Sequence, residues 1–301
     1  MSSSVSRQMT CYNQIFINLQ LHIHFMEHNS MLPLVKWVGS KKRLLTTLEK
    51  LMPEHYDYYC EPFVGGGSLF FHIHPKKAWI NDINQELMTL YRIIGTQLDE
   101  IKAVIDTFEN TKECYMQVRA WDRDVEGYSK RSDAQKVARL LYLNHTCFNG
   151  LYRVNSKGFF NTPFGKYANP TILHMDRARA IIDYFADSEI KMTCLDFKEV
   201  LDSLTPGTFV YLDPPYMPLK DSSFTRYTSD NFMYSDHRQL LETCQSLDKR
   251  GIKFMLSNSM TETVIKLFAN FSITEVKTTR FINANHKDRG KVSEVVIRNY
   301  F

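Results

Sequence analysis

The stretch TFVYLDPPY, residues 208–216, decides the fold class of this chain. Its first five residues are aromatic, aliphatic or β-branched and predict a buried strand that ends at the Asp213 carboxylate. Pro214 and Pro215 then fix two φ angles and leave their carbonyl oxygens free as acceptors. Because open α/β sheets bind ligands at the carboxyl ends of their strands, we expect Asp213, the Pro214 carbonyl and the Tyr216 ring to receive a planar group that carries an amine, such as adenine or cytosine. A strand cap followed by a proline-rich turn is the simpler alternative.

Apolar runs alternate with helical patterns on both sides of this strand. Further strands are predicted where short apolar or aromatic runs are bounded by turn residues, at 56–63, 77–84, 189–197, 252–259 and 293–301. Helices are predicted where apolar residues recur every three or four positions, at 85–109, 237–251 and 261–271. This alternation is typical of parallel β-α-β units, so the sequence predicts an α/β, Rossmann-like sheet with helices on both faces.

The middle of the chain has a different character. Residues 110–150 are charged and mainly helical in pattern, and 150–170 place two aromatic runs around a polar turn, which predicts a β-hairpin. A helix is predicted at about 171–187, where the chain leads back to the sheet. We therefore expect an insertion at 110–188 that interrupts the α/β domain.

The composition is that of a globular protein, with 44% hydrophobic and 23% charged residues in a chain of 301. The net charge of +4 is compatible with a polyanionic partner and equally with a slightly basic enzyme. The sequence has no apolar run of about 18 residues, the length that a membrane helix needs. Six cysteines without a C-x-x-C pair, and without histidines at ligand spacing, predict reduced thiols in the cytoplasm and no metal site.

The first 31 residues carry no signal-peptide pattern, because polar residues interrupt their apolar part and only one basic residue comes early. We interpret residues 1–31 as an extension of uncertain order. Alternatively, the assigned start of translation lies too early, and Met26 or Met31 is the real first residue.

A glycine turn, EPFVGGGS at 61–68, ends the strand predicted at 56–63. Glycines let a ligand approach the backbone closely, and the following helix start offers unpaired N–H groups, so the turn suits a nucleotide-like ligand. The pattern is neither G-x-G-x-x-G nor a P-loop, which argues against a nucleotide-dependent oxidoreductase. Asp82, at the end of the next strand, could accept hydrogen bonds from ribose hydroxyls, although a tight turn beside a solvated aspartate explains the same residues.

Several motifs, taken in order, resemble the Dam-type adenine-N6 DNA methyltransferases, and most of all the DpnII-type methylases that modify GATC. They are KWVGSK (36–41), EPFVGGGSLFF (61–71), INDIN (80–84), FNGLYRVNSKGFFNTPFGKY (148–167) and VYLDPPY (210–216). The resemblance runs from about Leu34 to the last residue. It implies an S-adenosylmethionine-dependent methyltransferase fold in which 32–109 and 189–301 form the catalytic, cofactor-binding domain. By the same resemblance, 110–188 is a DNA target-recognition insertion.

The resemblance also implies a site for S-adenosylmethionine, residue by residue. Trp37 and Lys41 of the first motif contact the cofactor, and the F-x-G-x-G turn surrounds its methionine part. Asp82 holds the ribose hydroxyls, and residues of CLDF (194–197) flank the adenine. The implied cofactor residues are Trp37, Lys41, Phe63, Gly65, Gly67, Asp82, Asp196, Phe197 and Asp213. Ser40 departs from the family, which usually has glycine there, and serine would be strained if this position needs a positive φ.

The implied reaction is methyl transfer from S-adenosylmethionine to N6 of adenine. Asp213, Pro214 and Tyr216 are the implied catalytic residues. The carboxylate and the Pro214 carbonyl accept hydrogen bonds from N6–H, which favours an sp3-like nitrogen and steadies the charge that develops on it. Tyr216 stacks on an adenine that has been flipped out of the duplex. The reaction implies no metal.

The insertion is then implied to read DNA. Arg153 suits bidentate recognition of guanine O6 and N7 in the major groove. With it, the resemblance implies these readers or wedges: Lys36, Asn149, Leu151, Arg153, Pro163 and Tyr167. Phe148 replaces a residue that is often tyrosine in the family. Lys166 and Arg139 are candidate phosphate contacts or ordinary solvated charges, and the basic stretch 280–294 is a loop that touches DNA or is merely solvated.

We therefore predict a cytoplasmic, site-specific DNA adenine-N6 methyltransferase with GATC as its expected target and double-stranded DNA as its partner. Single-stranded DNA stays open as a further substrate, and the expected state is a monomer or weak dimer. The nearest alternatives methylate cytosine N4 or an RNA adenine, and the motif order and the FNGLYR hairpin argue against them. Another alternative is a catalytically silent DNA-binding relative, and the intact Asp213, Pro214 and Tyr216 argue against it.

Overall fold

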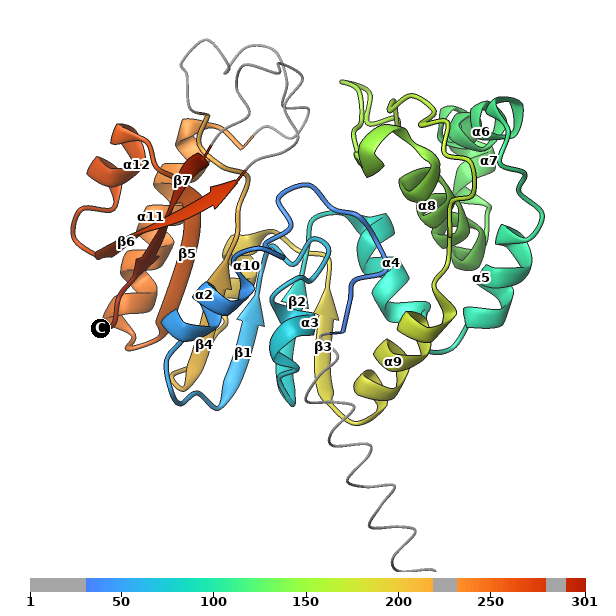
Figure 1. The fold of residues 1–301 in the computed structure, drawn as a ribbon. Coiled ribbons are helices and arrows are strands. Elements are labelled where there is room, and N and C mark those ends of the chain that lie inside the picture. The colour runs from blue at the N-terminus through green and yellow to red at the C-terminus, as the bar shows by residue number, and fades with distance from the viewer. Residues whose placement is uncertain (1–30, 219–231, 280–290) are drawn as a thin grey trace, which may run out of the picture.

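The computed structural model describes residues 31–218, 232–279 and 291–301. Most of the predicted extension at 1–31, and most of the predicted basic loop at 280–294, lies outside these described residues. Within them, the strands are β1 Tyr58–Glu61, β2 Lys77–Asn81, β3 Glu189–Thr193, β4 Thr208–Leu212, β5 Lys253–Ser259, β6 Ser272–Thr279 and β7 Lys291–Arg298. They form one seven-stranded sheet in the order β3-β2-β1-β4-β5-β7-β6 (Figure 1).

The sheet is mainly parallel, as the strand–helix alternation predicts. Strands β3, β2, β1, β4 and β5 run parallel to one another, whereas β7 lies antiparallel between β5 and β6. The α/β fold class is confirmed, and each predicted strand is present. The sequence analysis missed β6, because this strand lies at the sheet edge and, among its described side chains, buries only Val276. Without a buried face, an edge strand has little apolar periodicity to detect.

The strand order reverses between β1 and β4, and this reversal places the site. The chain runs outward from β1 to β2 and β3 on one side, and from β4 to β5 on the other. Tyr59 pairs with Ala78 of β2 and with Phe209 of β4, so the carboxyl ends of these three strands lie together. Open α/β sheets bind ligands in the crevice at such a switch point.

Helices cover both faces of the sheet, as predicted. They are α2 Leu45–Leu51, α3 Phe70–Ile73, α4 Gln85–Ile93, α5 Leu98–Ile105, α6 Lys112–Arg119, α7 Val125–Ser129, α8 Asp133–Thr146, α9 Met175–Ala186, α10 Phe197–Asp202, α11 Tyr234–Lys249 and α12 Glu262–Leu267, with short 3-10 turns η1 Ala120–Arg123 and η2 Phe148–Gly150. Successive strand residues point to opposite faces, so Tyr59 packs with α3, α4 and α9 while Cys60 packs with α10, α11 and α12. In the part of the chain that the structure describes, no helix has the length and apolar character needed to cross a membrane.

The helix predicted at 85–109 is two helices. Helix α4 ends at Ile93, and the chain turns through Gly95 before α5 begins at Leu98, with the Gln97 N–H donating to the Ile93 carbonyl at 2.8 Å. The apolar periodicity continues across the turn because both helices bury one face, so the pattern alone does not reveal the break.

The predicted hairpin at 150–170 is present in an irregular form. Two isolated antiparallel bridges, Val154 with Phe160 and Cys147 with Phe164, hold it together. Its turn closes where the Gly158 N–H donates to the Asn155 carbonyl at 2.9 Å. Figure 1 shows helices α5 to α8 gathered with this hairpin at one end of the molecule, opposite β6 and α12.

Arg139 is neither the phosphate contact nor the solvated surface charge that the sequence analysis left open, so both interpretations are wrong. Its side chain is 1% exposed and lies inside the group formed by α4, η1, α7 and α8. The guanidinium pairs with Asp122 at 2.7 Å and with Glu86 at 3.3 Å. Because the Arg139 guanidinium is buried and paired with carboxylates, it has a structural role and cannot reach DNA.

Candidate active site and DNA-reading hairpin

The Asp213 carboxylate lies at the carboxyl end of β4, where it meets Lys41. The Lys41 Nζ atom is 2.7 Å from Asp213 Oδ2, and the two side chains are 6% and 18% exposed. Asp213 Oδ1 is buried and accepts no hydrogen bond from the residues that the structure describes. Burial raises the pKa of Asp213 and the Lys41 ammonium opposes that rise. One carboxylate oxygen is therefore held by the protein, and the other remains available to a ligand.

Tyr216 is held beside this pair. The Lys41 ammonium lies 4.7 Å from the centroid of the Tyr216 ring, and the Tyr216 hydroxyl donates to Glu294 Oε2 at 2.8 Å. Glu294 comes from β7 and is buried, so the hydroxyl end of the ring is fixed from the far side of β5. The ring orientation is thus set by one cation and one hydrogen bond.

The end of β5 clasps the turn that follows Tyr216. Asn258 Oδ1 accepts from the Met217 N–H at 3.1 Å, and the Ser259 hydroxyl donates to the Met217 carbonyl at 2.6 Å. Both side chains are buried. The sequence analysis missed these residues, although three polar residues, 257–259, at the end of an apolar strand are a detectable signal.

The glycine turn after β1 needs glycine for two physical reasons. Gly65 and Gly67 have φ values of 49° and 70°, in the left-handed region. A Cβ atom at Gly65 would lie 2.8 Å from Cδ1 of Trp37, and one at Gly67 would lie 2.8 Å from the ring of Phe71. The turn therefore allows close approach, and the Trp37 ring rests directly on its backbone.

Asp82 is bound into the same turn. Its Oδ2 atom accepts from the Gly65 N–H at 2.9 Å, and its Oδ1 atom accepts from the Asn84 N–H at 2.9 Å. These two bonds fix the Asp82 carboxylate at the end of β2, beside the glycine turn. The structure thus brings Trp37, Gly65 and Asp82 together at the carboxyl ends of β1 and β2.

Asn81 organises three strand ends and was missed by the sequence analysis. Its amide donates to the carbonyls of Pro62 and Leu195, both at 3.0 Å, and accepts from the Leu195 N–H at 2.8 Å. The side chain is buried, next to the more exposed Asp82. The hydrogen-bond partners of Asn81 are distant in the chain, so the sequence gives no sign of its role. The sequence pattern therefore indicates only the adjacent Asp82 as a site residue.

Aromatic rings gather at the end of β3. The Phe63 and Phe197 centroids are 5.2 Å apart, and Phe232 lies 6.0 Å from each of them. Asp196 is exposed and caps α10 by accepting from the Lys198 N–H at 2.8 Å. The structure therefore brings Phe63 and Phe197 together, as expected, and adds Phe232, which the sequence analysis did not identify.

The departure at Ser40 causes no backbone strain. Gly39 has the positive φ, 83°, while Ser40 is absent from the described non-glycine residues with positive φ. The Ser40 hydroxyl instead pairs with the Ser68 hydroxyl at 2.8 Å, which links the first motif to the glycine turn. The family's usual glycine at this position is therefore not required here.

The predicted DNA readers lie on the hairpin or beside it. Arg153 is exposed, and its Nε atom donates to Asn161 Oδ1 at 2.7 Å. The Asn149 N–H donates to the Tyr167 hydroxyl at 3.1 Å, and the Lys36 ammonium lies 5.0 Å from the Tyr167 ring centroid. Of the remaining predicted readers, Leu151 is half-buried and Pro163 is exposed. The candidate phosphate contact Lys166 is also exposed. Phe148 is 51% exposed.

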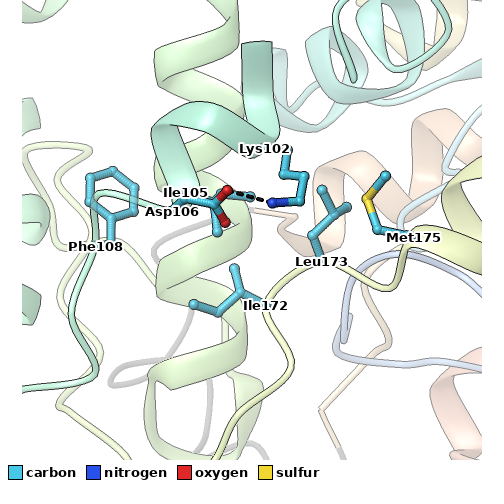
Figure 2. Close-up of a pocket in the computed structure, with 7 residues that line it drawn as sticks. All are labelled: Lys102, Ile105, Asp106, Phe108, Ile172, Leu173 and Met175. Atoms are coloured by element: carbon cyan, nitrogen blue, oxygen red, sulfur yellow. Dashed lines mark hydrogen bonds and ion pairs between the residues drawn. The ribbon is translucent and has the colours of Figure 1, made fainter. Parts of the chain in front are cut away.

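Two cavities of the described residues lie away from these predicted site residues. One of about 360 Å³ lies between α5 and 172–175, where the Lys102–Asp106 ion pair faces Ile172 and Leu173 (Figure 2). Another of about 640 Å³ lies around 54–57 and 73–77, at the amino ends of β1 and β2. Neither of these two cavities includes a predicted site residue.

A sheet that reverses between β1 and β4, a glycine turn after β1 and D-P-P-Y after β4 place this chain in the class of α/β proteins that bind a ligand at a switch point of the sheet. The comparison with known families gives the particular group. The family model described as D12 class N6 adenine-specific DNA methyltransferase matches residues 37–282. The chain belongs to this family and is an adenine-specific DNA methyltransferase.

Individual relatives agree with this assignment. The chain is 40% identical to the Type II methyltransferase M1.LlaDCHI of Lactococcus lactis, over 89% of this chain and 95% of that protein. It is 37% identical to the Type II methyltransferase M.MjaIII of Methanocaldococcus jannaschii, over 89% of this chain and 99% of that protein. It is 32% identical to the DNA adenine methylase of Escherichia coli K12, over 87% of this chain and 93% of that protein.

The family implies S-adenosylmethionine as methyl donor and DNA as substrate, and the strand ends fit this donor. Asp82 places a carboxylate at the end of β2, beside the Gly65 backbone and the Trp37 ring that packs on it. Asp213 Oδ1 is buried without a partner among the described residues, beside the Tyr216 ring. A buried acceptor of this kind normally has a partner, and a bound ligand would supply one.

Proposed function

We propose that this enzyme methylates N6 of the adenine in GATC, in duplex DNA, after rotating that adenine out of the helix. The observation that carries the proposal is the arrangement at β4: a half-satisfied Asp213 carboxylate beside an oriented Tyr216 ring. The resemblance of the hairpin motif at 148–167 to methylases that modify GATC supports the target sequence.

Asp213, Pro214 and Tyr216 are the proposed catalytic residues. The adenine N6 amine is a weak nucleophile because its lone pair is delocalised into the ring. Asp213 Oδ1 and the Pro214 carbonyl accept hydrogen bonds from the two N6–H groups, which favours a pyramidal nitrogen and stabilises the positive charge that develops on it. The Asp213 carboxylate also offers an acceptor for the proton that N6 loses.

S-adenosylmethionine, when bound, supplies an electrophilic methyl group on a sulfonium. The residues that we propose to hold it are Trp37, Lys41, Phe63, Gly65, Gly67, Asp82, Asp196, Phe197 and Asp213. Lys41 has a second task in this proposal. Its ammonium, 2.7 Å from Asp213 Oδ2, keeps the catalytic carboxylate ionised against the burial that raises its pKa.

The insertion at 110–188 is the proposed target-recognition unit, and 32–109 with 189–301 is the proposed catalytic domain. Arg153 is exposed on the hairpin and is the proposed reader of a guanine. The other proposed DNA contacts are Lys36, Asn149, Leu151, Pro163 and Tyr167. Base rotation is required because a target amine inside the duplex cannot reach Asp213.

A digestion assay tests the target sequence. DNA from a host that lacks GATC methylation and expresses this protein should resist a nuclease that cuts only unmethylated GATC. DNA from cells that express Asp213→Ala should be cut fully, which controls for expression effects. Complete cutting with both proteins would rule out GATC as the target.

A fluorescence assay tests base rotation separately. A duplex with 2-aminopurine in place of the target adenine should brighten when the protein binds, because an unstacked 2-aminopurine is no longer quenched by its neighbours. A duplex with 2-aminopurine one position away serves as control. Equal responses from the two duplexes would argue against rotation of the target base.

A further inference from the structure

Trp37 lies between two parts of the molecule that have different tasks. Its side chain packs on the glycine turn: a Cβ at Gly65 would lie 2.8 Å from Cδ1 of the Trp37 ring, and a Cβ at Gly66 would lie 3.0 Å from the Trp37 Cβ. Its ring also stacks on Tyr152 of the hairpin, with centroids 5.0 Å apart and planes 24° from parallel. A single side chain therefore contacts both the glycine turn and the hairpin.

Tyr152 occupies the hairpin position between two proposed DNA readers. Leu151 and Arg153 flank it, and the Arg153 side chain is exposed whereas Tyr152 turns inward and is half-buried. Its ring packs edge-on against Phe160 at 5.6 Å, on the other arm of the hairpin. Because both neighbours are proposed DNA contacts, a shift of the hairpin backbone on DNA binding would move the ring that stacks on Trp37.

The backbone next to Trp37 is clasped by the same insertion. Asn144, at the end of α8, accepts from the Lys36 N–H at 2.8 Å and donates to the Lys36 carbonyl at 2.7 Å. A Cβ at Gly150 would lie 2.5 Å from Cδ of Lys36, so the start of the hairpin also packs on this residue. Asn144 is fully buried, so these bonds are shielded from water.

The same short segment ends at the catalytic carboxylate. Lys41, four residues after Trp37, donates to Asp213 Oδ2 at 2.7 Å and to the Gly39 carbonyl at 2.6 Å. Residues 36–41 are thus held by Asn144 and Tyr152 at one end and by Asp213 at the other. Because residues 36–41 are held at both ends, a movement of the hairpin that displaces Trp37 should also alter the contact between Trp37 and the glycine turn.

We propose that Tyr152 is a positioning residue that couples target DNA to the cofactor site. Target DNA on the hairpin orders Tyr152, Tyr152 fixes the Trp37 ring, and the fixed ring completes the binding surface at the glycine turn. Cofactor and target DNA then each tighten the binding of the other by the same factor. The proposal rests on the proposed function of the hairpin and of Trp37.

The test measures S-adenosylhomocysteine binding to the full chain by calorimetry, with this unreactive product as probe. Each protein is titrated alone, with a GATC duplex and with a duplex of scrambled sequence. The proteins are wild type, Tyr152→Leu, Tyr152→Phe and the matched control Phe159→Leu, which alters a hairpin aromatic that has no described contact with Trp37. Melting temperatures record any general loss of structure.

For wild type, the GATC duplex should lower the Kd of S-adenosylhomocysteine by about 5-fold or more relative to the scrambled duplex. Tyr152→Leu should abolish this ratio, whereas Tyr152→Phe and Phe159→Leu should keep it. A merely structural role would weaken all Kd values together and leave the ratio unchanged, which would overturn the proposal. Wild type that binds both ligands without any coupling would also overturn it.

Failure of the proposed function itself has a separate signature. A wild-type chain that binds S-adenosylhomocysteine but does not distinguish the two duplexes in direct DNA titrations would contradict the GATC assignment. In that case the same ratio is measured with the duplex that the protein does methylate. Loss of the coupling in Tyr152→Leu on that duplex would support the positioning role, and its retention would overturn it.

Discussion

The carboxyl end of β4 and the hairpin proposed to read DNA differ in how their backbones are held. Strand β4 pairs with β1 and β5 on both sides, and the turn after Tyr216 is bonded to Asn258 and Ser259. The hairpin has two isolated bridges, and two of its non-glycine residues, Asn149 and Lys166, have positive φ. The backbone at the end of β4 is thus fixed by strand pairing on both sides and by buried hydrogen bonds. The hairpin is more exposed and has less regular strand pairing.

The difference follows from what each region must do. Displacement at a methyl group requires the reacting atoms to be aligned within a narrow range, so the groups around Asp213 need rigid support. A surface proposed to read DNA must keep donors such as Arg153 exposed so that they can reach base edges. Changes near Asp213 should therefore slow turnover, whereas changes in the hairpin should alter the choice of target.

The largest effect is expected for Asp213→Ala. The substitution removes the acceptor for N6–H, and we expect kcat to fall by about 100-fold or more, as for other preorganised groups at a reacting centre. Single-turnover methylation of a target duplex measures this loss. Asp202→Ala, which removes an exposed acid from α10, is the matched control and should keep full activity. Near-normal turnover of Asp213→Ala would contradict the catalytic role.

Arg153→Ala should weaken the recognition of target DNA that we propose for the hairpin. Loss of a bidentate contact to guanine should cost about 1–3 kcal/mol, which is about 5- to 150-fold in kcat/KM on the target duplex. Duplexes with one substituted guanine should lose less, because they already lack the contact. Lys157→Ala, an exposed cation at the hairpin turn, controls for general loss of charge. An unchanged preference among the duplexes would remove Arg153 as a reader.

Lys41→Met should shift the pH dependence of methylation. The Lys41 ammonium lowers the pKa of Asp213, which burial raises, so its removal lets that pKa rise further. Catalysis needs the ionised carboxylate, and the acidic limb of the kcat/KM profile should therefore move to higher pH. Profiles of wild type and variant, measured with saturating cofactor, test the direction of the shift. A limb that stays in place or moves to lower pH would refute this role.

The smallest effect on activity is expected for Tyr216→Phe. The ring proposed to stack on the base is kept, so activity should stay within a few-fold of wild type. The buried Glu294 carboxylate loses its donor, which should reduce the free energy of unfolding by about 1–3 kcal/mol. Urea unfolding measures this change, with Tyr234→Phe, an exposed tyrosine of α11, as control. A large loss of turnover with unchanged stability would assign the hydroxyl to the chemistry instead.

Local patterns in the sequence predict much of the fold because strands and helices have their own periodicity. The run at 208–212 reads as a buried strand, and its pairing between β1 and β5 requires that character. Patterns fail where a strand has little buried face, as at β6, or where a turn separates two helices that bury similar faces, as between α4 and α5. Arg139 shows the same limit, since a charged residue in a helical pattern reads as exposed, although it is buried here.

By itself, the sequence determined the α/β class, the glycine turn and the acid that ends β4, because each of these depends on neighbouring residues. Only the tertiary structure decided what surrounds them. Lys41 meets Asp213 across 172 residues of chain, and Asn144 meets Lys36 across 108. Such pairs leave no periodic signal, since they arise only when the sheet brings distant strand ends to one edge. The physical reason is that secondary structure is encoded locally, whereas the partners of a buried polar group are set by the packing of the whole chain.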